Sequence, residues 1–170
     1  TTGVMTDGNG ALTISYDASN DFMTTALTLN TESISVFAVN QTPNGSFAPI
    51  VGLGGATAYL NLEIQNAQDA NLKVYAGNGS TYTTHASSTG TSTDAMLYSY
   101  SKVGNALSGY VNGAQEISAT ETKSSSGVLG FRVRSKVTVT YISEVVIYQS
   151  DQSSNRTNIE SNINTFYDIF

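Results

Sequence analysis

The most constraining feature of the sequence is a β-type run near its C-terminus, residues 137–148. It reads VTVTYISEVVIY, with β-branched and aromatic residues and no Gly or Pro, which is typical of a β-strand. Its second half is apolar on both alternating sides, which carry Val145 and Ile147, and Ile142, Val146 and Tyr148. A strand with two apolar faces is expected inside a sheet that is covered on both sides. The run therefore predicts a central strand.

A helix is predicted directly after this strand. The polar residues 150–154 interrupt the strand pattern, and apolar residues then recur at i, i+4, i+7 and i+11, namely Ile159, Ile163, Phe166 and Phe170. This spacing indicates one apolar stripe along an amphipathic helix. Ser153 is the expected N-cap. We therefore expect a core strand that leads into a single helix lying on a β-structured body.

The rest of the chain is typical of an all-β protein. Charged residues make up 12% of the 170 residues, and only two are proline. About twelve strand-like runs are separated by turn signals about every ten residues, and Asn112-Gly113 is the strongest hairpin signal among them. We predict an antiparallel two-sheet β-sandwich, a jelly roll, with one C-terminal α-helix. Residues 1–170 are expected to form one domain, with the polar residues 1–10 as a linker from a longer parent chain.

Charge and composition exclude several classes of partner. The net charge of −6 and the pI of about 4.5 argue against nucleic acid, because phosphate binding needs a basic surface. No run of eighteen apolar residues is present, so no membrane span is expected. The chain contains no Cys and starts with Thr1. We expect no disulfide and a chain that was processed or taken from a longer protein.

Four segments, in this order, resemble a known superfamily: residues 17–22 (DASNDF), 33–39 (SISVFAV), 110–113 (YVNG) and 141–157, which contains YISEVVIY followed by SSNRT. Together they are similar to the concanavalin A-like lectin/glucanase superfamily, and specifically to laminin-G-like modules of bacterial and bacteriophage surface or virion proteins. The resemblance covers about residues 11 to 170. The C-terminal strand and helix are its most specific part.

The resemblance implies a jelly roll at the cell exterior or on a virion surface. The first expected function is a non-enzymatic, lectin-like module that attaches to surface polysaccharide. The alternative is a structural phage appendage or decoration domain that contacts neighbouring virion subunits within a larger oligomeric assembly. A glycoside hydrolase is the third hypothesis. The fold alone does not choose among them.

Tyrosines are the candidate carbohydrate-binding residues. The chain has ten Tyr and no Trp, and six tyrosines lie in its middle: Tyr59, Tyr75, Tyr82, Tyr98, Tyr100 and Tyr110. Two i, i+2 pairs, Tyr98 with Tyr100 and Tyr59 with Asn61, place their side chains on the same side of a strand. We predict these four residues as the ligand-binding face. The alternative is that the tyrosines belong to the core, since Met96 shares the alternation of Tyr98 and Tyr100.

Catalytic motifs are missing from the sequence. A glycosidase needs two carboxylates across the scissile bond, and Glu63, Asp94, Glu116 and Glu144 lie on or beside predicted strands. The Glu-x-Asp-x-Glu motif of the superfamily's glucanases does not occur, however. The chain has a single histidine, His85, and no Gly-x-Ser-x-Gly motif that would supply a nucleophilic serine. We predict no catalytic residues and no enzymatic activity.

Two further sets of charged residues are candidate sites. Asp17, Ser19 and Asp21 have the i, i+2, i+4 spacing of a Ca²⁺ loop but lack its Gly and its distal Glu, so an Asx-turn is the competing interpretation. Related modules often carry a structural Ca²⁺, and the resemblance implies Asp17 and Asp21 as its ligands. No other cofactor is predicted. Arg132, Arg134 and Lys136 share one strand face, either as a solvated surface or as a docking patch for an acidic polysaccharide or a neighbouring subunit.

Overall fold

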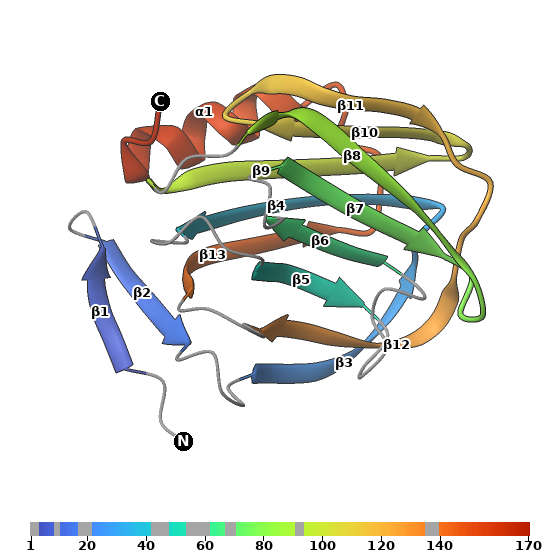
Figure 1. Cartoon of the computed structure of the whole chain (residues 1–170), viewed down its shortest axis with the longest axis horizontal. Coiled ribbons are helices and arrows are strands. Elements are labelled where there is room, and N and C mark those ends of the chain that lie inside the picture. Colours follow the sequence, from blue (N-terminus) through green and yellow to red (C-terminus); the bar gives the residue numbers. More distant parts are fainter. Residues whose placement is uncertain are drawn as a thin grey trace.

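Two antiparallel sheets and one helix make up the fold. The computed structural model describes residues 4–8, 11–16, 22–41, 48–53, 62–66, 71–90, 94–134 and 140–170. Figure 1 shows the sheets stacked face to face, with the helix at the C-terminal end of the chain. This is the predicted jelly-roll β-sandwich. No helix within the described ranges has the length and apolar character needed to cross a membrane.

Sheet A has seven strands in the order β1-β2-β13-β4-β9-β10-β11. Their bounds are β1 Val4–Gly8, β2 Ala11–Tyr16, β13 Thr140–Tyr148, β4 Ser33–Gln41, β9 Met96–Val103, β10 Ala106–Val111 and β11 Ala114–Thr120. Strand β13 lies between β2 and β4, so the predicted central strand is confirmed over its described part. Strand β1 lies within the segment interpreted as a linker and pairs with β2.

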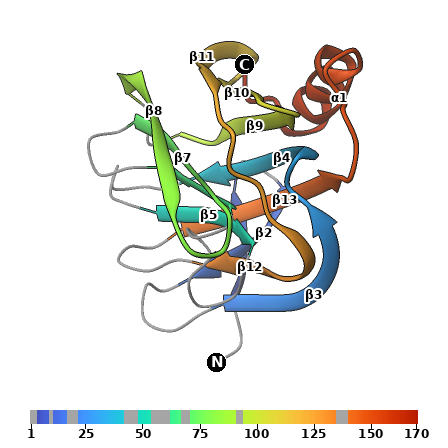
Figure 2. The same cartoon turned by 90° about the vertical axis from the view of Figure 1, so that its right-hand side faces the viewer.

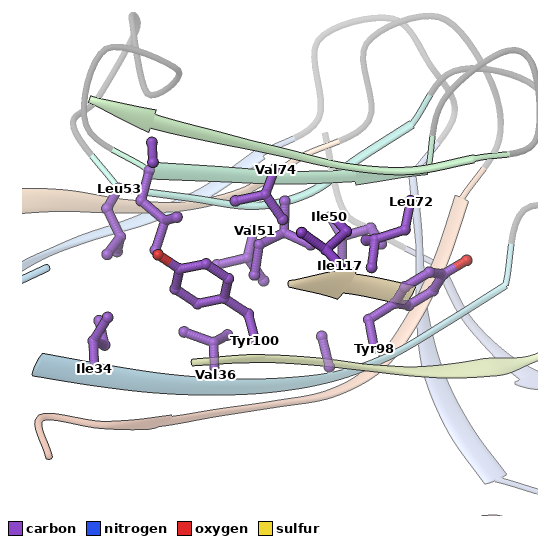
Figure 3. Packing of buried hydrophobic residues seen from close by; sticks show 14 of the residues in the cluster. Ile34, Val36, Ile50, Val51, Leu53, Leu72, Val74, Tyr98, Tyr100 and Ile117 are labelled. Atoms are coloured by element: carbon purple, nitrogen blue, oxygen red, sulfur yellow. The ribbon is translucent and has the colours of Figure 1, made fainter. Parts of the chain in front are cut away.

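Sheet B has six strands in the order β3-β12-β5-β6-β7-β8. Their bounds are β3 Phe22–Asn30, β12 Ser126–Arg134, β5 Ala48–Leu53, β6 Leu62–Asn66, β7 Asn71–Gly77 and β8 Tyr82–Gly90. Its inward residues and those of sheet A form the main core (Figure 3), which includes Ile34, Val36, Val51, Leu53 and Val74. Burying these branched side chains is the principal favourable term in folding.

A β-bulge changes the face of one residue in β13. The pairing of β13 with β4 shifts register between Ile142 and Glu144. Ile142 therefore joins the core between the sheets, although simple alternation placed it with Val146 and Tyr148, which pack under the helix. One extra residue in a strand reverses the alternation on one side of the bulge, so the prediction that Ile142 shares a face with Val146 and Tyr148 is wrong.

The helix α1 spans Arg156–Tyr167 and lies on the outer face of sheet A. Ile163 is buried in a second cluster with Phe37, Val39 and Leu97, which confirms that the helix docks. The predicted N-cap is wrong, because Asn155 occupies that position and its side chain makes no capping hydrogen bond.

The inward stripe of α1 differs from the predicted one. Phe166 is 75% exposed and Phe170 is also exposed, whereas Glu160 is buried. Glu160 accepts a hydrogen bond from Arg156, whose guanidinium lies 4.0 Å from the centroid of the Tyr110 ring. A buried carboxylate is tolerated when it is paired with a cation. The ion pair thus lies on the inward side of α1, whereas Phe166 faces solvent.

The observed burial along α1 predicts that two substitutions in this helix lower the free energy of unfolding by different amounts. Ile163→Ala should lower the free energy of unfolding by about 2–4 kcal/mol, because it removes buried methyl groups and leaves a cavity. Phe166→Ala should change it by less than about 0.5 kcal/mol, because the ring is mostly exposed. Urea denaturation of both variants measures this, and a larger loss for Phe166→Ala would contradict the packing described.

Candidate functional site

The predicted aromatic pair on β9 lies in the core. Tyr98 and Tyr100 are each 2% exposed. Figure 3 shows both rings between the sheets, with Tyr100 near Val36 and Val74 and Tyr98 near Leu72 and Ile117. A ring enclosed in this way cannot stack on a sugar. The prediction of an exposed pair is therefore wrong for these two residues, and the alternative of a Met-Tyr-Tyr core face is correct. Burial, and then the Glu121 charge, raise the pKa of the Tyr100 hydroxyl, which has no hydrogen-bond partner.

Several of the other predicted site residues lie outside the described residues. These are Tyr59, Asn61, Asp17, Asp21 and Lys136. Arg132 and Arg134 lie on β12, and their backbone pairs with β3. Among the residues that the structure describes, no three His, Cys, Asp or Glu side chains are grouped to hold a metal ion. The calcium site and the full basic patch remain predictions.

A different pair of tyrosines is exposed on sheet B, at the β7–β8 hairpin. In β7, Leu72, Val74 and Ala76 belong to the core. Because side chains alternate along a strand, Lys73 and Tyr75 lie on the outer face of sheet B. The outer face means here the face of this sheet that is turned away from sheet A.

The turn between β7 and β8 fixes how the hairpin presents these residues. The side-chain Oδ1 of Asn78 accepts hydrogen bonds from the backbone N–H groups of Ser80 and Thr81, at 3.1 and 2.9 Å. The N–H of Asn78 also donates to the carbonyl of Thr81. Gly79 has a φ of +88°, which a residue without Cβ adopts without strain. The Asn-Gly sequence therefore closes the hairpin locally.

Tyr75 and Tyr82 form an aromatic pair on this face. Tyr75 is opposite Thr84 in the register, so Tyr82 is its diagonal neighbour on the same face. The two ring centroids are 5.4 Å apart, with planes inclined at 58°, within the range of favourable aromatic contacts. Tyr82 is 45% exposed, and Thr84 beside it is also exposed. The pair forms an apolar platform bordered by hydroxyl groups.

A carboxylate stands beside the platform on the next strand. Glu63 in β6 is opposite Tyr75 in β7 and opposite Gly52 in β5. Its neighbours Leu62 and Ile64 belong to the core, so Glu63 lies on the outer face, where it is nevertheless only 1% exposed. The Glu63 carboxylate is therefore enclosed by protein atoms and has almost no contact with solvent.

The described carboxylates do not form a glycosidase pair on this face. Glu63 is the only Asp or Glu within the six strands of sheet B. Glu144 is on β13 and Glu116 is on β11, and both strands belong to sheet A. Glu144 also lines a hollow beside α1. Two carboxyl groups about 5–9.5 Å apart are needed for glycoside hydrolysis. The described strands of sheet B offer only one.

The single histidine lies at one edge of the sandwich. His85 of β8 contacts Glu121, which follows β11, with 2.9 Å between Nε2 and Oε2. The N–H of Lys123 donates to the other carboxylate oxygen at 2.7 Å, and Lys123 Nζ donates to Thr83 Oγ1 at 2.7 Å. Glu121, which directly follows β11 of sheet A, is thus bound to β8 of sheet B. We interpret this cluster as a structural link between them.

Hydrogen bonding controls the ionisation of Glu121. Burial acts to raise the pKa of its carboxyl group, but hydrogen bonds from Lys123, His85 and Thr83 and the Lys123 charge outweigh burial. The pKa of Glu121 therefore lies below its usual value.

Comparison of the sequence with known families gives no match. No family model matches the chain, and no curated protein is similar to it in sequence. The comparison of structures, in contrast, finds matches over most of the chain.

Three solved structures illustrate this similarity. The native heptameric SAP-like pentraxin from Limulus polyphemus has a TM-score of 0.64 at 10% identity, over 86% of this chain and 79% of its own. The carbohydrate-binding module CBM66 from Bacillus subtilis has a TM-score of 0.59 at 13% identity, over 86% and 91%. The receptor-binding domain of botulinum neurotoxin mosaic serotype C/D has a TM-score of 0.66 at 13% identity, over 98% and 44%. At such identities the similarity shows the fold alone, a two-sheet antiparallel jelly roll.

The sequence analysis counted Tyr75 and Tyr82 among the six central tyrosines but did not predict them as ligand-binding residues. The signal that identifies Tyr75 is the alternation of Leu72, Val74 and Ala76, which sends the residues between them outward. Tyr82 follows from the Asn78-Gly79 turn, because the hairpin register places it diagonally to Tyr75. An i, i+2 spacing shows only that two side chains share a face of a strand. It does not show whether that face is turned toward the core or toward solvent.

The depressed pKa of Glu121 predicts acid-dependent stability. Between the folded pKa and the usual value of about 4.3, the unfolded chain binds more protons than the folded chain, so stability rises with pH. The contribution is fully present above the usual value and is lost as pH falls through the folded pKa. Glu121→Gln should be less stable than the wild type by about 1–3 kcal/mol at pH 7, with a smaller difference at pH 3.

Urea denaturation of both proteins at the two pH values measures this difference. Other carboxyl groups titrate equally in the two proteins, so their effects cancel in the comparison. An equal difference at pH 7 and pH 3 would show that the ionised Glu121 does not stabilise the fold.

Proposed function

We propose that this chain is a non-enzymatic carbohydrate-binding module whose ligand lies on the outer face of sheet B. The observation that carries the proposal is the Tyr75–Tyr82 pair, with rings 5.4 Å apart and Tyr82 45% exposed. Aromatic side chains combine an apolar ring face with a polar hydroxyl. A sugar ring presents C–H groups on its faces and hydroxyl groups at its edge. The C–H groups can pack on the tyrosine rings, and the sugar hydroxyls can hydrogen-bond to the tyrosine hydroxyls.

The platform is preorganised for binding. Tyr75 and Tyr82 stand on paired strands, and the Asn78-Gly79 turn that joins these strands is hydrogen-bonded. Ordering costs on binding are small when the contacting side chains already stand on rigid elements. The fold similarity to a protein named as a carbohydrate-binding module supports the proposal. Within the described strands of sheet B, Glu63 is the single carboxylate, which favours binding over glycoside hydrolysis.

The biological setting belongs to the proposal as well. The module is part of a virion or cell-surface protein, lies outside the cell and attaches it to surface polysaccharide. A structural role, in which the module contacts neighbouring subunits, is the second candidate. It is favoured by the exposed rings Phe166 and Phe170 of the C-terminal segment, since exposed apolar side chains often mark contacts.

The aromatic platform is tested by Tyr82→Ala, with Phe166→Ala as the matched control. Both remove an exposed ring, but Phe166 lies on α1, against the outer face of sheet A. Tyr82→Ala should weaken glycan binding at least about tenfold, as the loss of one stacking contact of about 1.4 kcal/mol implies, while stability changes little. Phe166→Ala should leave glycan binding unchanged.

A glycan array followed by calorimetry on the best ligand gives these affinities. Equal affinities of Tyr82→Ala and the wild type would contradict the proposed face. If the wild type binds no glycan but self-associates through a contact that Phe166→Ala removes, the structural role is correct instead.

A further inference from the structure

A hollow lies between α1 and strand β13, on the outer face of sheet A and away from the tyrosine platform. Its volume is about 460 Å³, within the range of about 300–1,000 Å³ that is usual for small-molecule sites. The described residues that line it are Glu144 of β13 and, from α1, Asn162, Ile163, Thr165, Phe166 and Tyr167. The lining therefore combines one carboxylate with two aromatic rings and an aliphatic side chain.

The strand register places the Glu144 carboxylate on the helix side of sheet A. Glu144 is opposite Val39 of β4, and Val39 packs in the cluster under α1, so the two residues share this face. Burial, and then the negative charge of Glu144, raise the pKa of the Tyr167 hydroxyl. Glu144 is half-buried, and within the part of the chain that the structure describes its carboxylate has no hydrogen bond or ion pair. It is therefore available to a ligand.

The ring of Phe166 forms an apolar wall of the same hollow. It is 75% exposed and contacts the ring of Tyr167, with centroids 4.8 Å apart and planes inclined at 76°, a favourable edge-to-face arrangement. The hydroxyl of Tyr167 donates a hydrogen bond to the carbonyl of Ser143 at 3.3 Å. The two rings are thus anchored to the strand that carries Glu144.

The hydrogen-bonding groups of the hollow are mostly acceptors. Thr165 uses its hydroxyl proton within the helix, where it donates to the carbonyl of Ser161 at 2.7 Å, and Tyr167 uses its own on β13. Their oxygen atoms, like the carboxylate oxygens of Glu144, remain as acceptors. Among the described residues of the lining, the amide of Asn162 is the one side-chain donor, and none is a cation. A ligand for this hollow must therefore bring donors, and Glu144 favours a positive charge on it.

We propose that this hollow binds a small aliphatic amine, an organic ammonium ion with a short apolar stem. The ammonium group lies against the Glu144 carboxylate, which attracts it through its charge and through charge-assisted hydrogen bonds. The stem packs on Ile163 and on the Phe166 ring, whose face also attracts a cation. An anion is disfavoured by Glu144 and by the net charge of −6. This site is separate from the proposed glycan face on sheet B and does not depend on it.

Three ligands of similar size and different charge test the inference: n-pentylamine, 1-pentanol and pentanoate. NMR titration of the wild type at pH 7 measures the dissociation constant of each. Pentylamine, which is protonated at this pH, should bind at least about tenfold more tightly than pentanol or pentanoate. The signals that shift should be those of Glu144, Asn162 and Phe166. The preference for the amine should shrink at about 500 mM NaCl, because salt screens exposed charges.

A pair of variants with the same change of charge tests the role of Glu144. Glu144→Gln and the control Glu116→Gln each remove one half-buried carboxylate from sheet A, but Glu116 lies on β11, which β4, β9 and β10 separate from β13. Glu144→Gln should weaken pentylamine binding at least about tenfold and leave pentanol binding unchanged. Glu116→Gln should bind both ligands as the wild type does. Thermal unfolding checks that both variants are folded.

The outcomes separate this inference from the proposed function. Equal binding of pentylamine and pentanol, or equal losses in the two variants, overturns the ammonium site. It is also overturned if no ligand shifts the signals of the lining residues and those of α1 change with protein concentration instead, which would assign the hollow to a contact between copies of the chain. The wild-type comparison decides even if Glu144→Gln does not fold. None of these results bears on glycan binding, which Tyr82→Ala tests.

Discussion

The packing of β13 on both of its faces determines the arrangement of the molecule. Val145 and Ile147 pack against the core between the sheets, whereas Val146 and Tyr148 pack under α1. A strand that is apolar on both sides needs a cover on each, because exposed apolar surface is unfavourable in water. The helix supplies the second of these covers. It therefore occupies the outer face of sheet A.

The helix covers the outer face of sheet A, and the proposed binding surface lies on sheet B. Figure 2 shows α1 on one side of the molecule and the β7–β8 hairpin on the opposite side. Tyr75 and Tyr82 both belong to sheet B, the sheet away from the helix. A rigid β-sheet holds such residues at fixed spacing, which suits a repeating polymer. The helix that covers sheet A and the proposed binding surface thus lie on different faces of the sandwich.

The sequence predicted the sandwich, the central strand and the terminal helix, because hydrophobic periodicity reflects which surfaces are buried. It did not predict details that depend on tertiary contacts. The bulge after Ile142 reverses that residue's face, and the Arg156–Glu160 pair brings a charged residue to the inward side of α1. For the site, alternation placed Tyr98 and Tyr100 together, but only the sheet order shows that they point into the core.

The central claim is that a glycan lies on the outer face of sheet B, and NMR mapping of the bound polysaccharide tests it most directly. Amide and aromatic signals are followed while oligosaccharide fragments of the best-binding polysaccharide are added. The account predicts shifts concentrated at Tyr75, Tyr82 and Thr84, with the signals of α1 unchanged. Shifts confined to α1 and the outer face of sheet A, with Tyr75 and Tyr82 unaffected, would contradict it.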